Sequence, residues 1–264
     1  MKRFTPYEQW HCELVSSGAF DHLNKLFKLN EQSDWPSCSW FDGFLNATNA
    51  NNRPIVFKED DYFSAEERYY EQIIFDTGLV PTRQKNWHDL FGGFIWCLFP
   101  KTKSLLNKRH VQEINLHGTK QRSKHRNALT LFDECGVILA VTDDIWPSRL
   151  RNHQWQEAFV DLRGEWGKSI SPFMFGHANY EMLTKPYIGL TGKWLGLDMS
   201  AEVAGLPLNV QYRLVDQKLS ELIEQGGLND NRQLSPLPLL GVPGWYDDNQ
   251  HPSFYDNEQY FRPK

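Results

Sequence analysis

The hydrophobic pattern of the chain is mainly helical. Apolar side chains between positions 87 and 98 recur every three or four residues, as they do on one face of an α-helix. Asn86, followed three residues later by Asp89, is a helix-start signal, and Pro100 marks the end. Similar spacing or helix-end signals predict further helices over about 5–15, 19–27, 64–78, 102–114, 147–166, 171–186 and 211–227.

Short apolar runs predict a small amount of β-structure. Residues 128–132 and 137–141 flank the turn-like segment Asp-Glu-Cys-Gly, which predicts a β-hairpin near 128–141, and residues 53–58 predict a short strand. The last 36 residues are rich in proline and aromatics, which predicts an irregular strap. We therefore expect a mainly α fold with a small β-hairpin (α+β), in a single compact domain with an extended C-terminal strap. Its parts are a helical and loop region over 1–62, a helical core over 63–228 and the strap over 229–264.

Composition is that of an ordinary globular protein. The chain has 264 residues, enough for one large domain, and 40% of them are hydrophobic against 23% charged. No apolar run approaches the roughly 18 residues that span a membrane, and the amino terminus lacks a signal-peptide pattern. We therefore expect a cytoplasmic protein without a membrane partner. The four cysteines stand singly, which favours reduced thiols over a zinc ribbon or a disulfide framework.

Charge is unevenly distributed along the chain. The net charge is −5, yet the segment 101–126 holds eight Lys or Arg and one acidic residue. A basic block in an acidic protein indicates a phosphate-bearing or nucleic-acid partner, although a solvated helix face explains it equally well. The candidate anion-binding residues are Arg83, Lys101, Lys103, Asn107, Arg109, Arg122 and Arg126.

Titratable residues next to aromatic side chains are the candidates for chemistry. His177 and Glu181 are four apart, so on a helix they share one face and are candidate ligands for a divalent metal, the cofactor that this pattern suggests. The same spacing is common in ordinary surface pairs. His88 is either a hydrogen-bonded boundary residue or an acid-base group, and Asp133 is either a turn residue or a base. The candidate catalytic residues are His88, His110, Asp133, His177 and Glu181.

Two adjacent glycines interrupt the helix that carries His88. Each of Gly92 and Gly93 costs roughly 1 kcal/mol relative to alanine inside a helix, so close approach of a ligand or another backbone is expected there.

The motifs of common enzyme classes are absent from the sequence. It contains no GxxxxGK[ST], GxGxxG, GxSxG or HExxH.

Five ordered stretches resemble a bacterial family known as domain of unknown function 3025: "PTRQKNWHDLF", "FPKTKSLLNKRH", "RNALTLFDECGVILA", "FGHANYEMLTKP" and "LLGVPGWYDDN". The resemblance runs from about Gly78 to the carboxyl end. The family often has Asn at Gly92, Asp at Asn127 and Asn at Cys135, which makes Asn127 and Cys135 poor catalytic candidates here. The resemblance implies no particular activity or cofactor.

Three hypotheses of function follow from these patterns. The first is an enzyme, such as a metal-assisted hydrolase, that acts on a phosphate-bearing or nucleic-acid substrate by acid-base or metal-assisted chemistry. The alternative is a non-catalytic nucleic-acid-binding protein that uses the basic block. The third is an interaction protein that docks a partner through the C-terminal strap. The first hypothesis predicts that the five candidate catalytic residues meet in one pocket.

Overall fold

A computed structural model describes residues 4–16 and 18–264 of the chain. Residues 1–3 and 17, part of the region expected over 1–62, lie outside the described residues. The fold is 53% helical and 13% strand, which makes it α+β. The principal helices are α1 (Asp21–Phe27), α2 (Tyr70–Thr77), α3 (Trp87–Leu98), α4 (Pro100–His117), α5 (Lys124–Cys135), α6 (Ile145–Arg151), α7 (His177–Leu183) and α8 (Leu208–Glu224).

A four-stranded sheet with the order β4-β3-β5-β6 forms the larger β-element. Its central strand β3 (Gly136–Val141) is buried along its whole length, as expected for an unbroken apolar run. It pairs antiparallel with β4 (Ile170–Met174) and parallel with β5 (Thr191–Asp198), and β6 (Ser235–Pro238) pairs antiparallel with β5. A separate parallel pair joins β1 (Val56–Glu59) to β2 (Leu79–Thr82).

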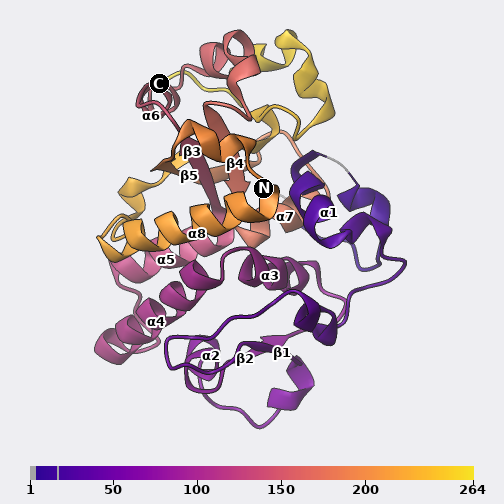
Figure 1. Cartoon of the computed structure of the whole chain (residues 1–264), viewed down its shortest axis with the longest axis vertical. Coiled ribbons are helices and arrows are strands. Elements are labelled where there is room, and N and C mark those ends of the chain that lie inside the picture. The colour runs from indigo at the N-terminus through magenta and orange to yellow at the C-terminus, as the bar shows by residue number, and fades with distance from the viewer. Residues whose placement is uncertain (1–3, 17) are drawn as a thin grey trace.

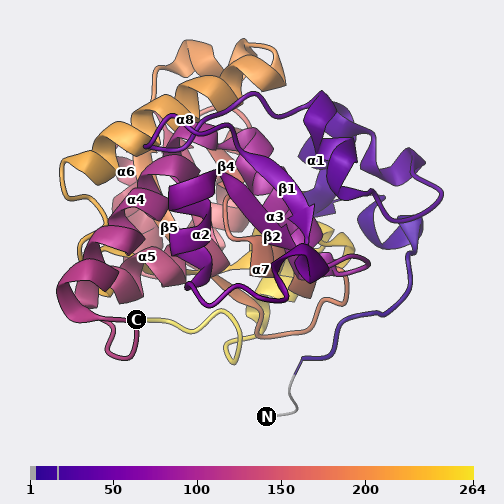
Figure 2. The same ribbon diagram turned by 90° about the horizontal axis from the view of Figure 1, so that it is seen from below.

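Helices α3, α4, α5, α7 and α8 lie between these two sheets (Figure 1). From top to bottom, Figure 1 passes from the four-stranded sheet through α5, α7 and α8 to α3 and α4, and then to α2 with the β1–β2 pair. Figure 2 looks at the molecule from the side of α2, β1 and β2. Aromatic and aliphatic side chains form one continuous core that includes Phe41, Phe91, Phe132, Trp194 and Leu237.

The expected β-hairpin near 128–141 is wrong. Residues 128–132 belong to α5, in which Ala128, Leu129 and Phe132 are buried at helical spacing. The Ser123 hydroxyl accepts a hydrogen bond from the Arg126 N–H at 3.0 Å, so the helix has a capped start that the hairpin interpretation overlooked. The run 137–141 is a strand as expected, but it pairs with β4 and β5.

Other boundaries also differ from the expected ones. Residues 79–82, for which no element was expected, form a strand, and the first part of the helix expected over 171–186 is β4. The helix expected over 147–166 ends at Arg151 and is followed by a π-helical turn, Glu157–Asp161. Between them His153 has φ +56°, which a continuing helix does not allow. Over 5–15 the helical part is a short 3-10 turn, Cys12–Val15.

The extended C-terminal strap is not confirmed. Residues 235–238 are a strand of the main sheet, and the segment that follows contributes buried side chains to the core. The Tyr260 hydroxyl donates to the carbonyl of Leu190 at 2.6 Å, and Asn249 Nδ2 donates to the carbonyls of Leu240 and Val242. These contacts make the segment part of the domain's structure.

The helix that carries His88 begins and ends as the sequence predicts. The Asn86 side chain accepts from the Asp89 N–H at 3.1 Å, and α3 ends at Leu98. Pro100 then begins α4, whose first free N–H groups, those of Lys101 and Thr102, donate to the buried Asp216 carboxylate on α8 at 3.0 and 2.9 Å. This cap fixes the corner between α3 and α4 against α8.

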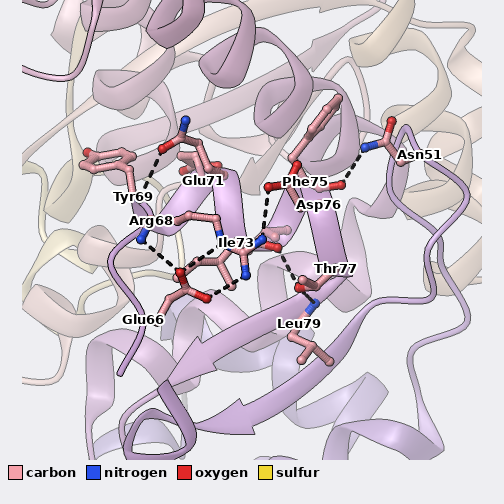
Figure 3. Close-up of polar contacts among 12 residues, drawn as sticks. Asn51, Glu66, Arg68, Tyr69, Glu71, Ile73, Phe75, Asp76, Thr77 and Leu79 are labelled. Atoms are coloured by element: carbon pink, nitrogen blue, oxygen red, sulfur yellow. Dashed lines mark hydrogen bonds and ion pairs between the residues drawn. The ribbon is translucent and has the colours of Figure 1, made fainter. Parts of the chain in front are cut away.

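Local polar contacts hold α2 and the turn into β2 (Figure 3). Arg68 bridges Glu66 and Asp76, with nitrogen–oxygen distances of 2.6 and 3.1 Å. The Thr77 hydroxyl donates to the Ile73 carbonyl at 2.6 Å and accepts from the Leu79 N–H at 3.0 Å. The start of α2, with Tyr69, Tyr70 and Glu71, lines the cavity described below. Within the described chain, no helix combines the length and apolarity needed to cross a bilayer.

Candidate active site

A cavity of about 370 Å³ lies where α2, α3, α4 and α5 meet the start of α7. The side chains in it come from segments distant in sequence. His88 projects from α3, Lys103 and His110 from α4, Asp133 and Glu134 from the end of α5, and His177 from the first position of α7. The size is that of a site for a small molecule.

Two glycines allow α5 and α7 to come together. The N–H groups of Phe175 and Gly176 both donate to the Gly136 carbonyl, at 3.0 and 2.8 Å. A Cβ at Gly176 would lie 2.4 Å from the Glu134 carbonyl oxygen and 2.5 Å from the Gly136 nitrogen, so only glycine fits. This backbone contact brings His177, the next residue, beside Glu134.

Three ligand-type atoms face one another in the cavity. His88 Nε2 lies 2.9 Å from His177 Nε2, and the Glu134 Oε2 atom lies 3.9 Å from the first and 3.6 Å from the second. Among residues 4–16 and 18–264 this is the one group of three His, Cys, Asp or Glu side chains whose ligand atoms all lie within 4.8 Å. Two imidazoles and one carboxylate are a common ligand set for divalent transition metals.

Glu181 orients one of the two imidazoles. Its Oε2 atom lies 3.1 Å from His88 Nδ1, so a neutral His88 donates its Nδ1–H to the carboxylate and carries its lone pair on Nε2. That lone pair points at His177 Nε2. Two Nε2 atoms at 2.9 Å require either a proton or a cation between them.

His177 is the most buried member of the group. It is 8% exposed, and its Nδ1 atom has no hydrogen-bond partner among the described residues. Burial lowers the pKa of His177 to about 4, so the imidazole is neutral at pH 7. Burial also acts on His88, but the Glu181 and Glu134 carboxylates outweigh it and raise the pKa of His88. Burial raises the pKa of Glu134.

An ion pair forms the neighbouring wall of the cavity. Lys103 Nζ lies 2.6 and 2.9 Å from the two Asp133 oxygens and 5.5 Å from the centre of the Trp96 ring. Burial alone would raise the pKa of Asp133, but the Lys103 ammonium and the nearby imidazoles hold it below its usual value. Asp133 is therefore a carboxylate at neutral pH. Lys103 could bind an anion from a ligand only while it also contacts Asp133.

The cavity has an excess of acid. Three cationic side chains line it, those of Arg83, Lys103 and Arg122, against the five carboxylates of Asp60, Glu71, Asp89, Asp133 and Glu134, a balance of −2. Arg83 is paired with Asp89 at 2.7 Å, and Lys103 with Asp133. A negative balance next to two imidazole rings, of which His177 is neutral, is the environment of a cation site.

Four of the five candidate catalytic residues line the cavity, and the fifth, Glu181, does not line it but contacts His88. His88, His177 and Glu181 are in direct contact, and Asp133 and His110 line the same cavity. The metal ligands expected from the sequence were His177 and Glu181. In the structure Glu181 contacts His88, and Glu134 faces the two imidazoles.

The candidate anion-binding residues are divided between several places. Arg83, Lys103 and Arg122 line the cavity, whereas Lys101, Asn107, Arg109 and Arg126 do not. Lys101 donates to Gln217 on α8, and Asn107 donates to the Glu71 carbonyl and carboxylate. Arg126 is buried, where it contacts the carbonyls of Gly118 and Thr119 and stacks on the Tyr69 ring.

Sequence reasoning missed Glu134 as a site residue because it assigned residues 133–136 to a hairpin turn. A helical interpretation of 124–135 would have placed this acid on the last turn before a buried strand.

The paired glycines, Gly92 and Gly93, have separate explanations. A Cβ at Gly93 would lie 2.4 Å from the Phe41 ring, whereas a Cβ at Gly92, which lines the cavity, would meet nothing within 4 Å.

Comparison with known proteins gives one match. A family model described as "Protein of unknown function (DUF3025)" matches residues 55–264, a range that includes every residue of the cavity named above. No curated protein and no solved structure gives a significant match.

Proposed function

The chain belongs to the DUF3025 family of proteins of unknown function, and we propose that it is a metal-dependent hydrolase that acts on a small phosphate-bearing molecule. The observation that carries this proposal is the group of His88 Nε2, His177 Nε2 and Glu134 Oε2, with separations of 2.9 to 3.9 Å, on the wall of a cavity of about 370 Å³.

Zinc is the ion that best fits this ligand set. Catalytic zinc sites use three protein ligands of the His and Glu type and leave a fourth position to water. Ligand atoms about 2.0–2.1 Å from a tetrahedral ion lie roughly 3.3 Å apart, and the observed separations fall on both sides of that value. Bound zinc would remove the repulsion between the two facing lone pairs and neutralise the acidic excess. Glu181 would act on the ion through His88, whose ring it orients.

The cavity contains the groups that hydrolysis requires. A zinc ion held by His88, His177 and Glu134 would activate a water as the nucleophile at neutral pH. Lys103 is the most buried cation of the cavity wall and would bind an oxygen of the transferred group. Arg122 is exposed and, within residues 4–16 and 18–264, has no ion-pair partner, so it would meet the substrate at the mouth.

The observations favour a small substrate over a nucleic acid. A nucleic-acid-binding face needs a continuous row of exposed cations. Here Lys101 turns toward α8, Arg126 is buried under Tyr69, and Lys103 is paired inside the cavity. Docking of a partner through residues 229–264 is also disfavoured, because deletion of that segment would remove β6 from the sheet.

Turnover of phosphate monoesters tests the proposed substrate class. We expect the zinc-loaded protein to release phosphate from members of a panel of sugar and nucleoside monophosphates. The Lys103→Met variant should lower kcat/KM about 100-fold while its zinc content stays at one ion, because one charge-assisted bond to the reacting group is lost.

Lys101→Met is the matched control, since Lys101 lies on the same helix but contacts α8. It should leave kcat/KM unchanged. Equal losses in the two variants would show that charge at a distance, and not a contact in the cavity, is responsible. If the zinc-loaded protein releases phosphate from no monoester but cleaves carboxylic esters or amides, the proposed substrate class is wrong and the proposed metal site still stands.

A further inference from the structure

A second cavity, of about 290 Å³, lies on another side of α7. Tyr180 of α7 lines it, whereas His177 of the same helix lines the first cavity. Its other walls come from α1, from the segment between the π-helical turn and β4, and from the loop around Trp245. None of the proposed zinc ligands lines this second cavity.

The charge of the second cavity is opposite to that of the first. Lys25 and Arg163 line it together with a single carboxylate, that of Asp21, which gives a balance of +1 when His22 is neutral. In the described parts of the chain, neither Lys25 nor Arg163 makes an ion pair. An anion is therefore the complementary ligand, and a monoanion matches the balance better than a dianion.

The Arg163 guanidinium is held in place by neutral groups. It donates to the Asn249 carbonyl at 3.0 Å, to Asn249 Oδ1 at 2.9 Å and to the Tyr255 hydroxyl at 3.1 Å. These contacts fix its plane without neutralising its charge. A half-buried guanidinium that is oriented but has no carboxylate partner is suited to bind one from a ligand.

His22 adds an uncharged polar group to the wall. Its Nδ1 atom lies 3.0 Å from the Tyr212 hydroxyl, and burial, together with Lys25, lowers the pKa of His22 to about 4. The ring is therefore neutral at pH 7.

The remaining walls are aromatic or apolar. Trp166, Tyr180 and Trp245 line the cavity with Pro172, Met174 and Pro243. Such walls favour a planar apolar group over a sugar or a bare inorganic ion. We propose that this second cavity binds a small organic monoanion, a carboxylate attached to a planar apolar group, with its carboxylate at Lys25 and Arg163 and its apolar part against Trp166 and Trp245.

Calorimetric titration of the full chain with benzoate and phenylacetate tests this proposal. We expect one molecule of carboxylate to bind per chain, with benzamide, the uncharged analogue, at least tenfold weaker. Lys25→Met should weaken benzoate binding about tenfold, because a charge-assisted contact is lost. Lys28→Met is the matched control: Lys28 is exposed, pairs with Glu31 at 3.5 Å and does not line the cavity, so binding should not change.

A His177→Ala variant separates this site from the proposed zinc site, where a carboxylate could also bind. Benzoate affinity should be the same in His177→Ala and in the unaltered protein. Binding that is lost in His177→Ala but kept in Lys25→Met would assign the carboxylate to the first cavity and overturn the proposal. It would also be overturned if neither carboxylate binds at millimolar concentration, or if inorganic phosphate binds more tightly than benzoate.

Discussion

Replacing His177 by alanine is expected to lower the affinity of the protein for zinc by more than about 100-fold. The change removes one of three facing ligand atoms, and even groups that only orient a ligand contribute 10- to 100-fold to metal affinity. Competition with a chromophoric chelator at pH 7.5 measures the affinity, and far-ultraviolet circular dichroism checks that the variant is folded.

Two further variants test whether the loss of zinc affinity is specific to the three facing ligand atoms. Glu181→Gln should lower zinc affinity by an intermediate amount, about 10- to 100-fold, because Glu181 contacts His88 and is not itself one of the three facing atoms. His117→Ala is the control: His117 also lies near a carboxylate, 3.8 Å from Glu113, but outside the group. Equal zinc affinity in His177→Ala and His117→Ala would contradict the assignment.

Replacing Gly176 by alanine is expected to lower the free energy of unfolding by about 3 kcal/mol. A Cβ there would come within 2.4 to 2.6 Å of main-chain atoms of Glu134, Cys135 and Gly136, and main-chain atoms in a helix-strand junction cannot turn aside as a side chain can. The required shift would also separate His177 from Glu134. We therefore expect weaker zinc binding in addition to lower stability, as measured by urea unfolding and by chelator competition.

Gly92→Ala is the matched comparison. Its Cβ would meet nothing within 4 Å, so the helix should gain up to about 1 kcal/mol from the better helix former. Zinc binding should be unchanged. If Gly176→Ala were as stable as Gly92→Ala, the close contact between the two main chains would not be what positions His177.

The features that local sequence patterns predict are the ones that local interactions determine. Asn86, Asp89 and Pro100 bound α3 as expected, because a cap and a proline act within a few residues. Gly78, with φ +79°, ends α2 for the same kind of reason. His88 at the start of α3, and the pair of His177 and Glu181 on one short helix, could therefore be proposed as site residues from the sequence.

The misassigned segment shows where local patterns are insufficient. The short apolar run 128–132 fits either a strand or the buried face of a helix, and the Ser123 cap five residues before Ala128 went unrecognised. Because of that error, Glu134 was assigned to a turn and was not considered as a site residue. Short apolar runs are ambiguous between helix and strand until their tertiary neighbours are known.

The contacts that assemble the site are long-range and leave no local signal. The approach of Gly176 to Gly136 joins segments 40 positions apart, and the pairing of His88 with His177 spans 89 positions. The basic block looked continuous in the sequence because its members are adjacent there. On α4 and α5 they point in different directions, and Lys103 and Arg126 are engaged within the fold.

Anomalous diffraction at the zinc edge, from crystals grown with one equivalent of zinc, tests the central claim most directly. We predict one peak, about 2.0–2.1 Å from the Nε2 atoms of His88 and His177 and about 2.0–2.2 Å from a Glu134 carboxylate oxygen. A peak at the group of Glu113, His117 and His125 with none between His88 and His177, or no zinc peak at all, would contradict the claim.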